Sequence, residues 1–114
     1  MIAGSVILNH SHEDAYDEAT WLVEEPDDSK IMVIHTLTVH PLYFKNGVAR
    51  ALMDFSLQYS RAQGMRSVRL DVYEKNAPAI ALYKKCNFSY ITTVDLGLGE
   101  YGLKLFMLFE FPIL

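Results

Sequence analysis

The strongest constraint on the fold is a change of hydrophobic period in the middle of the chain. In Lys30–His40, apolar residues occupy both alternating faces, which is typical of a central strand covered on both sides. Between Gly47 and Gly64, apolar residues recur every three or four positions, which predicts an amphipathic helix. Ser67–Tyr73 alternates again, so the order predicts two parallel strands joined by a right-handed crossover. The helix stripe expected to face the sheet comprises Val48, Leu52, Phe55, Tyr59 and Ala62.

The rest of the chain predicts further strands and one more helix. Asn76 is suited to cap this helix, and Asn87 can end it in the left-handed conformation. Its expected buried stripe comprises Ala79, Leu82, Tyr83 and Cys86. Four more strands are expected, the first two as a hairpin: Ile2–Leu8, Ala19–Glu24, Phe88–Val94 and Leu103–Phe111. The 114 residues therefore predict one α+β domain, with two helices and a mixed, mainly antiparallel sheet around a central parallel strand pair.

The overall charge and the cysteine count narrow the classes of partner. The chain carries 10 Lys and Arg residues against 14 Asp and Glu residues, and its net charge of −4 disfavours nonspecific nucleic-acid binding. Cys86 is the one cysteine, so no intrachain disulfide can form and a reducing compartment is expected. No apolar run reaches the length of a membrane span. We therefore expect a cytoplasmic protein without nucleic-acid or membrane partners.

The turn between the central strand and the first helix, residues 40–50, has the features of an anion site. A helix N-terminus presents free backbone N–H groups, and the helix dipole favours negative charge there. Gly47 and Ala49 are small enough for a phosphate group to approach the backbone, and Lys45 and Arg50 add positive charge. The alternative is that Gly47 only allows the chain to turn and Ala49 only favours the helix.

Two motifs in the order expected for one family extend this interpretation. The first is Val39-His40-Pro41 followed by Phe44-Lys45-Asn46-Gly47-Val48-Ala49, and the second is Asn76-x-x-Ala79-x-x-Leu82-Tyr83 with Phe88 after the helix. Together they resemble the two signatures of the GNAT superfamily of N-acetyltransferases, and the resemblance is close over residues 31–88. Two departures stand out, because Phe44 replaces a polar Gln or Arg and Asn87 replaces a glycine.

The resemblance implies a V-shaped gap between the two parallel strands in which acetyl-CoA binds as co-substrate. Leu37, Thr38 and Val39 would contact the pantetheine arm, and Asn76 would lie beside it. Tyr83 would donate a proton to the departing CoA thiolate, a role suited to a phenol at the end of the acyl channel. The alternative for Tyr83 is a core aromatic of its helix. The backbone N–H groups expected to bind the pyrophosphate belong to Lys45, Asn46, Gly47, Val48, Ala49 and Arg50.

His35 is the candidate general base, because an imidazole titrates near the working pH and interrupts an apolar face of the central strand. The alternative is a half-buried histidine that is hydrogen-bonded within the sheet. Weaker candidates for the base or for amine recognition are Asp71, Tyr73 and Glu74. The acidic segment with His10 and His12 lacks a completing set of ligands, so no metal is expected.

The chain begins at what resembles the second strand of the family, without the first strand and helices that wall the acceptor site. We therefore expect either an open acceptor pocket, a pocket closed by a second subunit, or a partial copy of the fold. Apolar surface left uncovered in this way would favour a homodimer. The resemblance implies direct transfer of an acetyl group from acetyl-CoA to a primary amine on a small molecule or peptide. The alternatives are a non-catalytic CoA-binding module, a truncated remnant, and a structural domain without cofactor.

Overall fold

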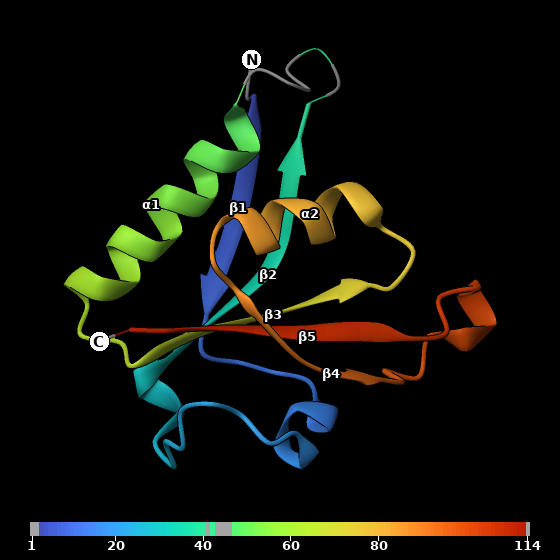
Figure 1. Cartoon of the computed structure of the whole chain (residues 1–114), viewed down its shortest axis with the longest axis horizontal. Helices are drawn as coiled ribbons and strands as arrows, with labels where there is room; N and C mark the ends of the chain where they lie inside the picture. Colours follow the sequence, from blue (N-terminus) through green and yellow to red (C-terminus); the bar gives the residue numbers. More distant parts are fainter. Residues whose placement is uncertain (1–2, 41, 43–46, 114) are drawn as a thin grey trace.

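The computed structural model describes residues 3–40, 42 and 47–113. Within these residues, five strands form one sheet in the order β1-β2-β3-β5-β4 (Figure 1). The strands are β1 (Gly4–Asn9), β2 (Ile31–Val39), β3 (Ser67–Tyr73), β4 (Ser89–Val94) and β5 (Phe106–Pro112). The two α-helices are α1 (Val48–Ala62) and α2 (Ala77–Lys85), and the short 3-10 helices are η1 (Asp14–Glu18), η2 (Asp28–Lys30) and η4 (Gly99–Tyr101).

The strand pairing confirms the predicted fold class. β2 and β3 are parallel neighbours at the centre, while β1 pairs with β2, β3 with β5 and β5 with β4 in antiparallel fashion. α1 provides the crossover between the two parallel strands (Figure 1). The second helix also agrees with its predicted ends, because the Asn76 side chain accepts a hydrogen bond from the backbone N–H of Ala79 and Asn87 has a φ of 68°.

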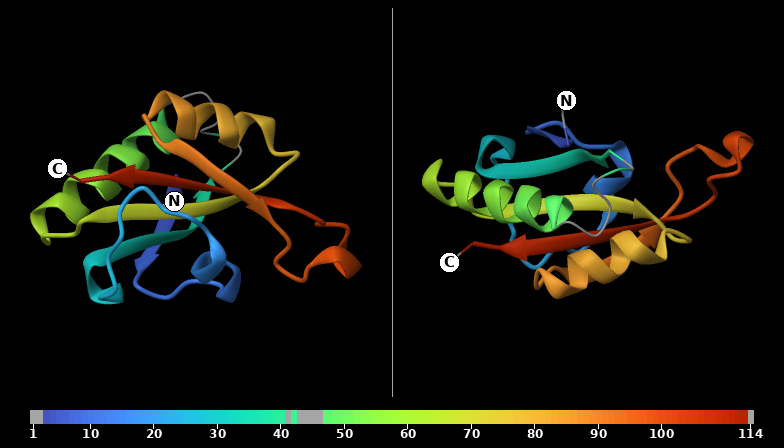
Figure 2. Two further views of the ribbon diagram at one scale, coloured as in Figure 1. Left: turned by 60° about the horizontal axis from the view of Figure 1, so that its bottom comes forward. Right: turned by 90° about the horizontal axis from the view of Figure 1, so that it is seen from above.

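The two faces of the sheet are covered differently, as the two views in Figure 2 show. One face packs against both helices, with Met53 of α1 and Tyr83 of α2 in the same apolar cluster as Leu70 of β3. The opposite face is covered by the connection between β1 and β2, residues 10–30, through Tyr16 and Trp21. None of the described helices is both long and apolar enough to cross a membrane.

The predicted strand at Ala19–Glu24 was wrong. The segment is irregular, and β1 pairs directly with β2, so residues 10–30 form one long connection. Its backbone N–H and C=O groups form hydrogen bonds with side chains of the sheet rather than with a neighbouring strand. The Glu110 carboxylate accepts from the N–H of Leu22 at 2.6 Å, and the Arg69 guanidinium donates to the carbonyl of Val23 at 2.7 Å.

The predicted buried stripe of α1 was partly wrong. Phe55 and Tyr59 are 55% and 41% exposed and stack on each other, with ring centroids 5.9 Å apart. The buried face instead contains Met53, Ser56 and Ser60. Both serine hydroxyls donate to backbone carbonyls four residues earlier at 2.7 Å, so these small residues can be buried without an unsatisfied polar group.

Candidate functional site

The parallel strands β2 and β3 separate partway along their length. Their paired residues run from Ile31 and Ser67 to Ile34 and Leu70, whereas β2 continues to Val39 and β3 to Tyr73. Beyond Leu70, each strand still pairs with its outer neighbour, so the edges that face the gap lack a strand partner among the described residues. Such edges offer backbone N–H and C=O groups to an extended ligand. This register agrees with the V-shaped gap that the resemblance implies.

A groove of about 930 Å³ lies at this gap and combines three elements. The end of β2, the beginning of α1 and one face of α2 line it with these residues: Leu37, Thr38, Val39, Gly47, Val48, Ala49, Arg50, Asn76, Pro78, Ala79, Leu82 and Lys85. Eight of the ten residues predicted to bind the cofactor are among them. The other two, Lys45 and Asn46, lie outside the described residues, as does Phe44.

The sequence interpretation missed the contribution of α2 beyond Asn76. Pro78, Leu82 and Lys85 lie four and three residues apart, so they share one helix face that borders the groove. This spacing, together with Asn76 at the start of the helix, could have identified them. Lys85 is the notable addition, because it brings a second positive charge to the groove besides Arg50.

The groove ends at the N-terminus of α1. Gly47 is the N-cap residue of the helix with φ 76°, and it has no side chain with which to cap the first-turn N–H groups. A Cβ atom there would meet nothing within 4 Å, so glycine is favoured by the left-handed conformation rather than by lack of space. The first turn contains no acidic residue, and Arg50 forms an exposed ion pair with Asp54 at 3.2 Å. These features leave the first-turn N–H groups suited to a phosphate.

Tyr83 lies in the core rather than along the groove. Its ring is 6% exposed and packs against Phe88 and Phe109. Burial raises the pKa of Tyr83, and the nearby negative charge of Asp71 raises it further. Tyr83 is thus a core aromatic of α2, as the alternative interpretation of its sequence position expected.

His35 and Asp71 follow the last paired residues of β2 and β3. They therefore stand on either side of the point where the two strands separate, which is the mouth of the gap. The His35 side chain is exposed rather than half-buried, and its Nε2 lies 2.6 Å from the Asn9 Oδ1. Burial raises the pKa of Asp71, whereas a hydrogen bond from Tyr16 and the charge of His35 lower it. Asp71, a weaker candidate in the sequence, is thus a carboxyl group at the gap with a raised pKa.

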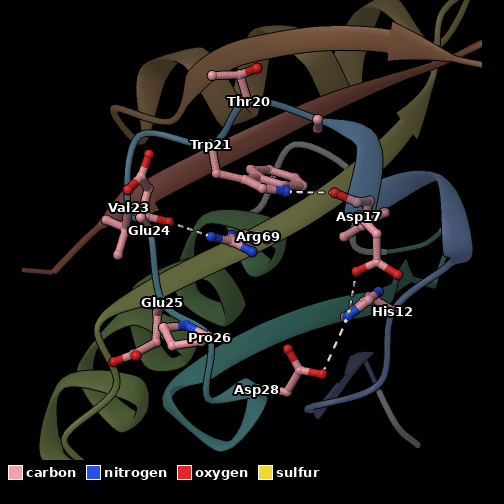
Figure 3. Close-up of a pocket in the computed structure, with 12 residues that line it drawn as sticks. His12, Asp17, Thr20, Trp21, Val23, Glu24, Glu25, Pro26, Asp28 and Arg69 are labelled. Carbon is pink, nitrogen blue, oxygen red and sulfur yellow. Dashed lines mark hydrogen bonds and ion pairs between the residues drawn. The ribbon is translucent and has the colours of Figure 1, made fainter.

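A second, polar pocket of about 400 Å³ lies under the 10–30 connection (Figure 3). Arg69 lies 4.2 Å from the ring centroid of Trp21 and is ion-paired with the buried Glu110 at 2.9 Å. His12 lies 3.6 Å from both Asp17 and Asp28. Among the described residues, no group of three or more His, Cys, Asp or Glu side chains could hold a metal ion.

Comparisons with known proteins agree with this geometry. Residues 2–88 match the profile of the family described as "Acetyltransferase (GNAT) family". The chain is 31% identical over 68 residues to the UPF0157 protein YqkA of Bacillus subtilis, a match that covers 60% of this chain and 19% of that protein.

Two solved structures share the fold at comparable identity. Ard1 from Thermoplasma volcanium is 30% identical with a TM-score of 0.67, and covers 74% of this chain and 55% of its own. The ribosomal-protein-S18-alanine N-acetyltransferase from Escherichia coli is 26% identical with a TM-score of 0.66 and the same two coverages of 74% and 55%. The chain thus spans little more than half of these two structures. Because the family profile covers most of its residues, the chain belongs to the GNAT family of acetyltransferases.

Proposed function

We propose that this chain transfers an acetyl group from acetyl-CoA to a primary amine by direct attack. The observation that carries the proposal is the continuous groove from the open strand edges to the N-terminus of α1. An extended thiol arm matches the first part, and a pyrophosphate matches the second. Its volume of about 930 Å³ lies within the range of cavities that enclose cofactor-sized molecules.

The proposed cofactor contacts follow from this path. Leu37, Thr38 and Val39 would bind the pantetheine arm, and Asn76 would lie beside it. The first-turn N–H groups of α1, with those of Lys45 and Asn46 before it, would bind the pyrophosphate. The side chains of Arg50 and Lys85 border the same groove and would add attraction for phosphate.

The proposed chemistry needs one group to accept a proton and one to donate it. As the amine nitrogen bonds to the thioester carbonyl, it loses a proton, and the CoA sulfur leaves as a thiolate that takes up a proton. Asp71 and His35 at the mouth of the gap are the proposed bases, acting directly or through water. Tyr83, the tyrosine of the second motif, is the proposed acid, and its phenol is protonated at neutral pH, since burial raises the pKa of Tyr83.

The face opposite the helices is the proposed approach for the acceptor. Asp71 lies on that face with Tyr16, whereas the groove lies beside α1 and α2. The name of the Escherichia coli relative specifies an alanine of a ribosomal protein, so peptide N-termini belong among the acceptors to test. Small primary amines remain equally compatible with an open polar surface.

The runner-up is a CoA-binding module without catalysis. It is favoured by the burial of Tyr83, which is only 6% exposed. One pair of assays separates the two functions. A thermal shift with acetyl-CoA measures binding, because a ligand specific to the folded state stabilises it by mass action. Thiol release over amino acids, polyamines, aminoglycosides and peptide N-termini measures transfer.

The proposed enzyme predicts both a shift and thiol release. A shift without release across the whole panel would favour the binding module. No shift at saturating acetyl-CoA would contradict both functions.

We also propose a cytoplasmic homodimer. The stacked Phe55 and Tyr59 on α1 form an exposed aromatic pair, and such surface favours association. The free thiol of Cys86 is compatible with a reducing compartment.

A further inference from the structure

The connection between β1 and β2 brings one buried side chain to the mouth of the gap. The Tyr16 hydroxyl donates a hydrogen bond of 2.6 Å to Oδ2 of Asp71, across 55 positions of sequence. Tyr16 is 2% exposed and Asp71 is half-buried, so the contact is partly shielded from water on the tyrosine side. Oδ1 of Asp71 makes no hydrogen bond within the described part of the chain. Since no buried polar side-chain atom there lacks a partner, Oδ1 must reach the surface.

The position of Tyr16 is determined by several contacts. The indole N–H of Trp21 donates to the backbone carbonyl of Tyr16 at 2.8 Å, and the His12 ring stacks on the Tyr16 ring at 5.6 Å. The Glu110 carboxylate then fixes the following residues through the N–H of Leu22. The pocket view shows how Trp21 and Arg69 stack beneath this connection (Figure 3). Tyr16 is therefore held by the sheet face rather than by a loose loop.

We infer that Tyr16 is a positioning residue for Asp71, orienting the carboxylate so that Oδ1 accepts the proton of the attacking amine. This inference rests on the proposed acetyl transfer. A hydrogen bond to one carboxylate oxygen restricts rotation of the group and directs the other oxygen outward. A purely structural tyrosine would pack equally well without its hydroxyl, so the hydroxyl itself is the testable feature.

The charges around Asp71 predict the sign of the effect. The Tyr16 hydrogen bond and His35 of β2 lower the pKa of Asp71, while burial and Glu13 raise it. The negative charge of Asp71 raises the pKa of Tyr83 on α2, and the positive charge of Arg69 lowers the pKa of Tyr16. Loss of the hydroxyl removes stabilisation of the ionised carboxylate, so the pKa of Asp71 should rise.

The test is Tyr16→Phe, with Tyr101→Phe as a matched control because Tyr101 is 70% exposed and far along the chain in η4. We expect kcat to fall about tenfold, with the KM for acetyl-CoA within about twofold of the parent. The acid limb of the kcat profile should move up by about one pH unit, which corresponds to one charge-assisted hydrogen bond. In an Asp71→Asn background, Tyr16→Phe should add less than about twofold.

An unmoved acid limb with kcat within about twofold of the parent would overturn the positioning role. The ¹³C resonance of the Asp71 carboxyl gives a readout that does not need turnover. If the parent protein acetylates no amine but Tyr16→Phe still raises the Asp71 pKa, the proposed function fails while the contact stands, and the positioning role in catalysis fails with the function. An unshifted resonance would refute the contact itself, whether or not the protein is active.

Discussion

Glu110 is the single residue on which the 10–30 connection depends most. It is 0% exposed on β5, and its carboxylate accepts hydrogen bonds from Leu22, Val23, Ser67 and Arg69 at 2.6, 3.3, 2.7 and 2.9 Å. Glu110→Gln keeps the shape of the side chain but replaces one acceptor oxygen by an NH₂ donor. That donor would face donors, and the buried Arg69 would lose its ion-pair partner. We expect a loss of about 3–5 kcal/mol in the free energy of unfolding, as for other broken buried pairs.

Urea denaturation followed by circular dichroism gives this difference, with the exposed Glu100 of η4 as the control site for the same substitution. Glu100→Gln should change stability by less than about 0.5 kcal/mol. Amide hydrogen exchange should show that Leu22 and Val23 lose protection before the strands do in the Glu110 variant. A loss below about 1 kcal/mol for Glu110→Gln, or unchanged protection at Leu22, would refute the assignment of Glu110 as the anchor.

Three further predictions follow from the site and the surface. Gly47→Ala should destabilise the protein by about 1 kcal/mol, because φ is 76° there, and thermal denaturation will show whether it does. Asp71 has a raised pKa in the folded protein, so its contribution to stability is present at low pH and is lost as pH rises through that pKa. The stability of Asp71→Asn relative to the parent protein should therefore be greater at neutral pH than at low pH, and the variant should release thiol more slowly. A stability difference between the two proteins that does not change with pH in thermal melts would contradict this. Light scattering should show a dimer that weakens in Phe55→Ser, and a clean monomer of the parent at micromolar concentration would rule the dimer out.

The elements predicted from local patterns agree with the structure. The alternating residues of β3 and the glycines at the two ends of α1 act on their neighbours along the chain. The period of the strand and the ends of the helix can therefore be predicted from the sequence. Asn76 and Asn87 are likewise local signals, since one caps the helix and the other adopts the left-handed conformation. These residues determine the local backbone conformation through contacts with atoms only a few positions away in the sequence.

The elements that sequence reasoning missed depend on distant partners. Ala19–Glu24 contains three consecutive apolar residues, Trp21–Val23, yet its backbone bonds to Glu110, 88 positions beyond Leu22, and no local pattern indicates such a bond. The α1 stripe was misjudged because size and apolarity favoured Phe55, whereas Ser56 is buried with its hydroxyl bonded inside the helix. A serine whose hydroxyl bonds a carbonyl of its own helix can be buried although the residue type is polar.

The candidate site divides in the same way. The cofactor groove follows from two motifs whose residues line it, whereas Lys85 was missed although its helix spacing places it there. The Tyr16–Asp71 contact could not be predicted, because the two residues come from a 3-10 helix and a strand that meet only in the folded sheet. The burial of Tyr83 was predicted from the stripe of its helix and is confirmed, whereas its ring partners Phe88 and Phe109 could not be predicted from the sequence.

The most direct test of the central claim is mass spectrometry of amine acceptors incubated with acetyl-CoA and the purified chain. The proposed acetyltransferase predicts that at least one amine gains a single acetyl group as free CoA thiol is released in equal amount. Tyr83→Phe should slow this reaction while leaving the affinity for acetyl-CoA unchanged. Full occupancy by acetyl-CoA without an acetylated product from any amine would contradict the claim of catalysis, and absence of binding would contradict the claim of a cofactor groove.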